Sequence, residues 1–222
     1  GVKKEFRLPL TEAIEGHITG TLKKGVVLPP IRKSDNKCRW GAIDVDGNIY
    51  KDDNFKREII NKTIELDLPL VACFSKSKGL HLYIRFEEWT DAQKVIDILH
   101  TFLNKLELPQ DTECFPKQAI VGDKPTDTGN GIMLPFMYGV GNDWIKQYNG
   151  KGFTTGTKEE LEECLYSKRV KAEDIEIKLP SKSNGSTKTS TKYSKSEIIK
   201  KIKNGTIENC PVLGGKYRGW IQ

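Results

Sequence analysis

Apolar residues along this chain gather in short runs of the kind that form buried β-strands. The clearest runs lie at 38–46 (CRWGAIDVD) and 70–74 (LVACF). Residues 80–86 (LHLYIRF) alternate between apolar and polar types, as expected for a strand with two different faces. A shorter run at 112–115 (TECF) predicts a fourth strand.

Between these runs the apolar residues recur at helical spacing. Asp52 and Asp53 suit a helix N-terminus, and Thr90 with Gln93 predicts a capping box for a second helix that continues to Leu106. The inward faces of these two helices are predicted to carry Phe55, Ile59, Ile60 and Ile64 in the first and Val95, Ile98, Leu99 and Phe102 in the second. The order over residues 38–116 is then β-α-β-β-α-β, the split βαβ arrangement of ferredoxin-like and RNA-recognition-type folds. The predicted fold class is α+β.

Flanking segments add smaller elements to this core. A helix is expected from Thr11, strands near 26–28 and 132–136, and a helix capped by Thr157 with Glu160. Residues 181–194 are rich in Ser, Thr and Lys, the composition of a linker. The sequence therefore predicts one domain over 1–180, a linker over 181–194, and the start of a small C-terminal helical accessory region over 195–222.

Composition narrows the class of protein. The 222 residues are 36% hydrophobic and 30% charged, with a net charge of +6 that permits an anionic partner such as nucleic acid. No segment resembles a membrane span or a signal peptide. Five scattered cysteines without metal-binding spacing indicate a reducing compartment, so a cytoplasmic location in a bacterial or phage-infected cell is expected.

The first candidate chemistry lies at the end of the first strand. Asp44 and Asp46 stand two residues apart, so in a strand both side chains point to one face and can bind one cation site. Such oxygen ligands suit Mg²⁺ or Mn²⁺. The structural alternative is a strand that simply enters an Asp-Gly turn. A calcium loop does not fit, because the twelfth position counted from Asp44 is Phe55 rather than Glu.

Two further segments complete the candidate site. Residues 75–81 (SKSKGLH) form a hydroxyl- and lysine-rich turn that enters a strand at His81, and this turn could bind phosphates although it is no P-loop. The last core strand should lie beside the first and bring a carboxylate near Asp44. Glu113 is the favoured third metal ligand. Asp111, with the same strand parity, remains open, as does a purely solvent-facing acid.

The three segments together resemble the D-x-D, s-x-H and third-carboxylate motifs of archaeo-eukaryotic-type primases. The likeness extends to the polymerase domains of bacterial end-joining ligases and above all to the primase-polymerases of phages, mobile elements and TOTE conflict systems. It covers roughly residues 6–140. The segments that carry it are Leu10-Thr11, His17-x-x-Gly20, Asp44-x-Asp46, Lys78-Gly79-Leu80-His81, Glu113-x-Phe115-Pro116-Lys117-Gln118 and Gly129-Asn130-Gly131-Ile132-x-Leu134-Pro135. The departure is Gly79, where the family pattern has Ser; Ser77 or Ser75 would have to replace it.

The resemblance implies specific roles. Asp44, Asp46 and Glu113 would bind Mg²⁺ or Mn²⁺, and His81 with Ser77 would contact the phosphates of an incoming NTP or dNTP. Further nucleotide or template contacts would come from Lys78, Lys117, Gln118 and Asn130. A primer, a single-stranded DNA template and a helicase or helicase domain are the implied partners.

The sequence therefore predicts a metal-dependent DNA primase-polymerase catalytic domain, with an RNA-recognition-like core and N-terminal α/β elements that form the primase fold. The alternative from another class is a non-catalytic, RNA-recognition-type module that binds single-stranded nucleic acid. That module would give no reason for paired carboxylates in the sheet, and the aromatic RNP1 motif is absent. A cyclase or other nucleotidyl transferase with a palm-like sheet is a third possibility, disfavoured by the absence of a GGDEF-like hairpin.

Overall fold

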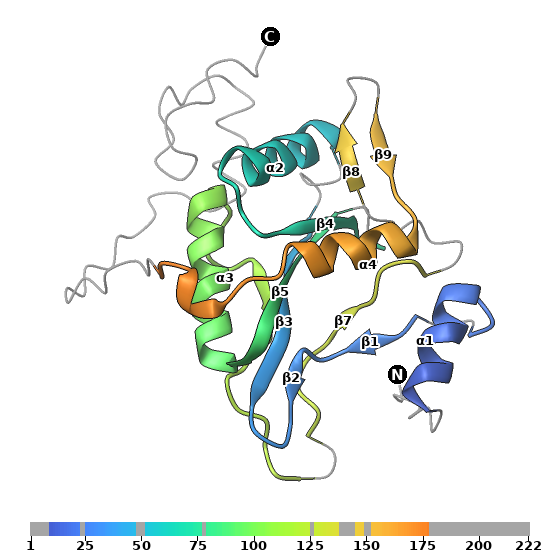
Figure 1. Ribbon diagram of the computed structural model, residues 1–222, viewed down its shortest axis with the longest axis vertical. Coiled ribbons are helices and arrows are strands. Elements are labelled where there is room, and N and C mark those ends of the chain that lie inside the picture. Colours follow the sequence, from blue (N-terminus) through green and yellow to red (C-terminus); the bar gives the residue numbers. More distant parts are fainter. Residues whose placement is uncertain are drawn as a thin grey trace, which may run out of the picture. The chain divides into compact units, whose positions relative to one another are not determined.

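The computed structural model describes residues 9–22, 25–47, 52–76, 79–124, 127–137, 145–148 and 152–177 (Figure 1). Within them the fold is a mixed α+β structure. The helices are α1 (Leu10–Thr19), α2 (Asp53–Glu65), α3 (Ala92–Leu106), α4 (Lys158–Ser167) and a 3₁₀ turn at Ala172–Asp174. The strands are β1 (Val27–Leu28), β2 (Ile31–Arg32), β3 (Lys37–Val45), β4 (Val71–Phe74), β5 (Leu80–Asp91), β6 (Glu113–Phe115), β7 (Ile132–Met133), β8 (Ile145–Tyr148) and β9 (Phe153–Thr155).

The central sheet contains β2, β3, β4, β5 and β6, and all its neighbouring strands are antiparallel. β3 pairs with β5 along one side, and with β2 and then β6 along the other. The core strands therefore lie in the order β4-β5-β3-β6. β3 is central, so side chains from both of its neighbours surround the end that carries Asp44.

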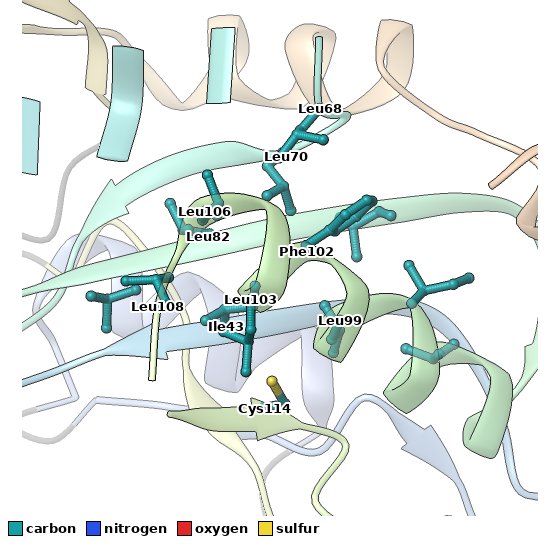
Figure 2. Close-up of a cluster of buried hydrophobic side chains, with 14 of the residues drawn as sticks. Ile43, Leu68, Leu70, Leu82, Leu99, Phe102, Leu103, Leu106, Leu108 and Cys114 are labelled. Carbon is teal, nitrogen blue, oxygen red and sulfur yellow. The ribbon is translucent and has the colours of Figure 1, made fainter. Parts of the chain in front are cut away.

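One face of this sheet packs against α2 and α3 and forms the larger core (Figure 2). Ile43 of β3 and Leu82 of β5 are fully buried there, together with Leu99 and Phe102 of α3. Gly41 allows this close approach, because a Cβ at that position would lie 2.9 Å from Val95 Cγ1. The helical periodicity predicted for α3 is confirmed by these buried residues.

The opposite face carries a smaller apolar cluster and the polar side chains of the candidate site. Ala42, Tyr83 and Phe115 lie in this cluster with Ile132 of β7 and Leu161 of α4. β7 pairs with β1, and this two-stranded sheet lies against the same face through a hydrogen bond from Tyr83 Oη to Met133 O (2.9 Å). None of the described helices is long and apolar enough to cross a membrane.

Several local predictions were wrong. The N-cap of α3 is Asp91, which accepts hydrogen bonds from the N–H groups of Gln93 and Lys94, because β5 continues through Thr90 and moves the helix start by one residue. Ile64 is 63% exposed rather than buried, because the buried face of α2 continues through Thr63 and Ile64 lies beside it. The β8–β9 hairpin and the short β2 were not predicted.

Other local predictions were correct. Asp52 caps α2 by accepting from Asn54 N–H, and Thr157 with Glu160 forms the capping box of α4. The predicted linker (181–194) and accessory region (195–222) lie outside the described residues, as do Ser77 and Lys78.

Candidate active site on the sheet

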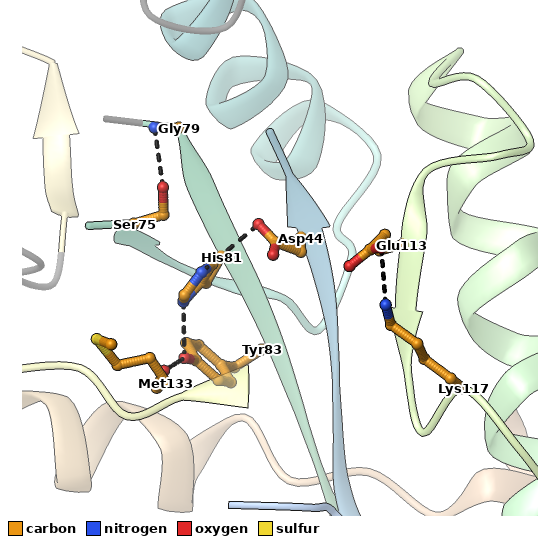
Figure 3. A network of polar contacts seen from close by, with 8 residues as sticks. All are labelled: Asp44, Ser75, Gly79, His81, Tyr83, Glu113, Lys117 and Met133. Atoms are coloured by element: carbon orange, nitrogen blue, oxygen red, sulfur yellow. Dashed lines mark hydrogen bonds and ion pairs between the residues drawn. The ribbon is translucent and has the colours of Figure 1, made fainter. Parts of the chain in front are cut away.

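Asp44 lies at the centre of the site because of strand register. Its Cα is paired with that of His81 on β5 and, on the other side, with that of Glu113 on β6 (Figure 3). Residues directly opposite in antiparallel strands point to the same face. The sheet therefore brings together three side chains that are 32 to 69 residues apart in the sequence, which is the juxtaposition expected from the sequence.

A close approach of two loops places Asp46 beside the second segment. A Cβ on Gly79 would lie 2.2 Å from Val45 O and 3.0 Å from Asp46 Oδ1, so only glycine fits there without movement. The same Cβ would lie 3.3 Å from Ser75 Oγ, which accepts a hydrogen bond from Gly79 N–H at 2.9 Å. Ser75 is buried, and its hydroxyl lies near the place where a serine side chain at position 79 would begin.

The hydrogen bonds of Tyr83 determine which nitrogen of His81 carries the proton. Tyr83 Oη donates its single proton to Met133 O, so at the 3.1 Å contact with His81 Nδ1 the imidazole must be the donor (Figure 3). Burial lowers the pKa of His81 to about 4 despite the opposing effect of the Asp46 charge. A neutral His81 with its proton on Nδ1 directs the Nε2 lone pair toward Asp44.

Asp44 Oδ1 faces that lone pair without a hydrogen bond. The two atoms are 3.5 Å apart, close enough to count as an ion pair only if the imidazole is charged, and Oδ1 is buried with no hydrogen-bond partner. Since the neutral tautomer makes both atoms acceptors, we regard the contact as unsatisfied. Burial, and secondarily the charges of Asp46 and Glu113, raise the pKa of Asp44 to about 6, an effect that Lys117 partly offsets. Around Asp44, the charges of two other carboxylates thus outweigh the effect of Lys117.

Glu113 reaches the site from the edge strand and forms an ion pair with Lys117 (2.7 Å) (Figure 3). Both side chains are partly exposed, so this pair is easily exchanged for another partner. Asp111, the alternative carboxylate, lies in the exposed turn before β6 and does not line the cavity described below. The register thus favours Glu113 over Asp111 as the third carboxylate beside Asp44.

These side chains border a cavity of about 550 Å³. From the predicted set, the walls contain Asp44, His81, Glu113, Lys117 and Asn130. The wall residues outside that set are Ser75, Lys76, Phe115, Gly131, Ile132 and Met133. Gln118 is not in the wall, but its Oε1 accepts a hydrogen bond from the Asn130 amide (3.1 Å) and so fixes that side chain. Two lysines, Lys76 and Lys117, and two carboxylate residues, Asp44 and Glu113, therefore line the same space.

A preformed metal centre is not present among the described side chains. No group of three or more His, Cys, Asp or Glu residues within those ranges converges closely enough to hold an ion. The donor chemistry nevertheless fits a hard divalent cation, because Asp44 Oδ1 is buried and unsatisfied and two more carboxylates lie nearby. A third ligand requires Glu113 to exchange Lys117 for the ion.

Sequence reasoning missed Tyr83, although strand alternation could have found it two residues after His81 on the same face. It left Ser75 open beside Ser77. His17, part of the resemblance motif, is fully buried: Nδ1 accepts from Val26 N–H (3.0 Å) and Nε2 donates to Pro135 O (2.9 Å). His17 thus joins α1 to the segment after β7 and does not reach the cavity.

Comparison with known families gives one match. The family model described as the archaeo-eukaryotic primase domain of the TOTE conflict system matches residues 2–143, more than half of the chain. That region contains all the residues of the cavity. No curated protein matches the chain.

Proposed function

Because the chain belongs to the archaeo-eukaryotic primase domain family of TOTE conflict systems, we propose that it is a metal-dependent DNA primase-polymerase. It would transfer nucleotides from NTPs or dNTPs to a primer, or start a chain, on a single-stranded template. The observation that carries the proposal is the register of β3, which sets Asp44 between His81 and Glu113 at the wall of a cavity. The RNA-recognition-like assignment of the core is part of the proposal, supported by the strand order β4-β5-β3-β6.

Asp44, Asp46 and Glu113 would hold Mg²⁺ or Mn²⁺. When bound, such ions supply charge neutralisation at the reacting phosphate and lower the pKa of an attacking hydroxyl. The buried Asp44 oxygen favours cation binding, because a desolvated carboxylate oxygen without a hydrogen bond is strongly stabilised by a cation. Lys117 would then release Glu113 and become available to the phosphates of the substrate.

The basic and hydroxyl groups of the cavity would orient the triphosphate. Lys76 and Lys117 line the space from different segments, and so does Ser75, whose hydroxyl is bonded to Gly79 N–H just before the strand that begins with Leu80. A volume of about 550 Å³ is within the range of small-molecule sites, roughly 300–1,000 Å³. Contacts from Ser77, Lys78, Gln118 and Asn130 remain predictions from the resemblance, as does a helicase partner.

The test is incorporation of labelled nucleotides on unprimed and primed single strands with Mg²⁺ or Mn²⁺. Asp44→Asn with Asp46→Asn should reduce product formation by at least about 100-fold, because electrostatic stabilisation of the transition state is lost. Glu113→Gln should reduce it strongly, whereas Asp111→Asn, a matched change in the exposed turn before β6, should not. Product on unprimed strands would identify a primase.

Failure has a defined meaning. A folded chain that binds single-stranded DNA but incorporates nothing with either metal would overturn the polymerase proposal and favour the binding module. Equal activity of the Asp44→Asn/Asp46→Asn variant would also overturn it, since the product would then come from another site or a contaminant.

A further inference from the structure

A second cavity, of about 360 Å³, lies on the same face of the sheet as the first. Its walls come from α1, β3, β5, the segment after β7, and α4. The apolar part of the wall contains Ile14, Ile18, Trp40, Tyr83, Leu134, Pro135, Phe136, Leu161 and Leu165. No residue proposed above for metal or phosphate binding lines it, so the proposed reaction does not explain this cavity.

Tyr83 separates the two cavities. Its ring lines the second cavity, while its hydroxyl bonds to His81 and to Met133, which line the first. Residues 134–136 of the second cavity directly follow Ile132 and Met133 of the first. A ligand that occupies both cavities would therefore lie along one continuous segment of the chain, residues 132–136.

Three aromatic side chains contribute to the apolar wall of the second cavity. Trp40 is half-buried, its ring 6.1 Å from that of Tyr83 and inclined at 51°, and Phe136 is half-buried as well. Aromatic faces of this kind stack on nucleobases of any sequence. The volume of the cavity suits one base with its sugar rather than a duplex.

Cations border this apolar surface. Arg39 and Arg85 both line the cavity, and no carboxylate among the described residues forms an ion pair with either. Lys158 also lines it, but is paired with Glu159 and Glu162. Glu162 lines the cavity too, but it is paired with Lys158. Within the described residues the two guanidinium groups have no acidic partner, and beside aromatic rings they give the charge and shape complementary to single-stranded nucleic acid.

The basic and aromatic pattern continues beyond the cavity. Arg39 also lies 5.8 Å from the ring centroid of Trp89, which is 40% exposed and is covered on one side by Arg32 at 3.5 Å. Arg39 thus connects the cavity to an exposed tryptophan near the end of β5.

We propose that the second cavity binds an unpaired base of a single DNA strand, stacked on Trp40 and Phe136, with neighbouring phosphates held by Arg39 and Arg85. This inference rests on the proposed function and places the template strand beside the nucleotide cavity, on the far side of Tyr83. The occupant is single-stranded nucleic acid. If the cavity instead holds a small apolar ligand or a partner helix, Trp40→Leu will leave DNA binding unchanged.

The base contact is tested by fluorescence anisotropy of a labelled oligothymidylate with the full chain, in chelator and without nucleotide. Trp40→Leu should weaken binding about tenfold, or about 1.4 kcal/mol, within the range for stacking of one base. Tyr166→Leu, an aromatic residue of α4 that is 60% exposed and outside the cavity, is the matched control and should bind as the unmodified chain does. Urea unfolding of each variant verifies that it is folded.

An abasic strand of the same length separates stacking from charge. Because it has no base to stack, Trp40→Leu and the unmodified chain should bind it equally. Equal oligothymidylate affinity for both proteins would overturn the proposal. So would a Trp40→Leu loss that is as large on the abasic strand, since the effect would then not come from the base.

The phosphate contacts are tested by salt dependence. Arg39→Gln with Arg85→Gln should lower the slope of log affinity against log salt by about 1.4, from about 0.7 for each phosphate contact on a single strand. Arg57→Gln with Lys105→Gln, on the helices that cover the other face, should leave the slope unchanged. An equal change in both double variants would show non-specific charge and overturn the assignment.

The binding assay needs neither metal nor nucleotide, so the two proposals fail separately. If nucleotide incorporation fails while oligothymidylate binding depends on Trp40, the cavity assignment stands as a binding site. If incorporation succeeds while Trp40→Leu binds normally, only the cavity assignment is lost.

Discussion

The two faces of the central sheet are built from the same strands but have opposite properties. β5 sends Leu82, Ile84 and Phe86 toward the helices, where each is fully buried among apolar neighbours. The intervening residues His81, Tyr83 and Arg85 point to the other face and border the two cavities. Because side chains alternate between faces along a strand, β5 contributes to the core with one set of residues and to the cavities with the other.

The two faces also differ in their effect on stability: the helical face stabilises the fold, whereas the other face contains an unfavourably buried carboxylate. The helical face buries mainly apolar side chains, and the hydroxyls of the buried Thr63 and Thr101 are bonded within their own helices. The apolar area stabilises the fold in proportion to the surface removed from water. On the other face Asp44 has lost much of its hydration, and its inner oxygen has no hydrogen bond. A carboxylate in this condition destabilises the folded state, and the helical core offsets that cost.

The largest expected effect comes from opening the helical face. Phe102 of α3 is 1% exposed, so Phe102→Ala should lower the free energy of unfolding by about 3–5 kcal/mol through lost burial and the cavity left behind. Urea denaturation measures this change. A loss below about 1 kcal/mol would contradict the description of this face as the main core.

A smaller loss is expected where the two loops of the site meet. Gly79→Ala would place a Cβ 2.2 Å from Val45 O, and relief of that overlap should cost about 1–3 kcal/mol of unfolding free energy. Gly152→Ala is the matched control, because a Cβ there meets no atom within 4 Å. Urea denaturation should show no loss for Gly152→Ala, and equal losses for both would contradict the close approach.

Removal of the Asp44 charge should stabilise the fold, in contrast to the two substitutions above. The side-chain amide introduced by Asp44→Asn could donate to His81 Nε2, so this substitution should raise the free energy of unfolding in chelator by about 1 kcal/mol. Mn²⁺ should raise the melting temperature of the unmodified chain but not that of Asp44→Asn, since a ligand bound only to the folded state stabilises it. A lower unfolding free energy of Asp44→Asn in chelator would contradict the description of Asp44 Oδ1 and His81 Nε2 as two facing acceptors.

The smallest effect is expected at the end of the apolar stripe of α2. Ile64 is 63% exposed, so Ile64→Lys should change the unfolding free energy by no more than about 0.5 kcal/mol. Ile60→Lys, one turn earlier and 5% exposed, provides the contrast and should prevent or severely weaken folding. Similar urea midpoints for the two variants would contradict the boundary of the helical face.

The sequence by itself determined the alternation that assigns residues to faces and the helical spacing of α3. It also placed the two capping residues Asp52 and Thr157, because these features depend on neighbours within a few positions. The paired carboxylates, His81 and Glu113 were readable as candidates for the same reason. The start of α3 was misplaced because Thr90 and Asp91 are both good caps locally, and only the length of β5 decides between them.

Tertiary structure alone decided the rest. The register of β6 against β3 brings Glu113 rather than Asp111 opposite Asp44, and no local pattern separates two acids of the same strand parity. The Tyr83–Met133 hydrogen bond, which fixes the tautomer of His81, joins residues 50 positions apart. The second cavity exists only where α1, α4 and the segment after β7 meet the sheet, because its walls come from separate parts of the chain whose packing no local pattern encodes.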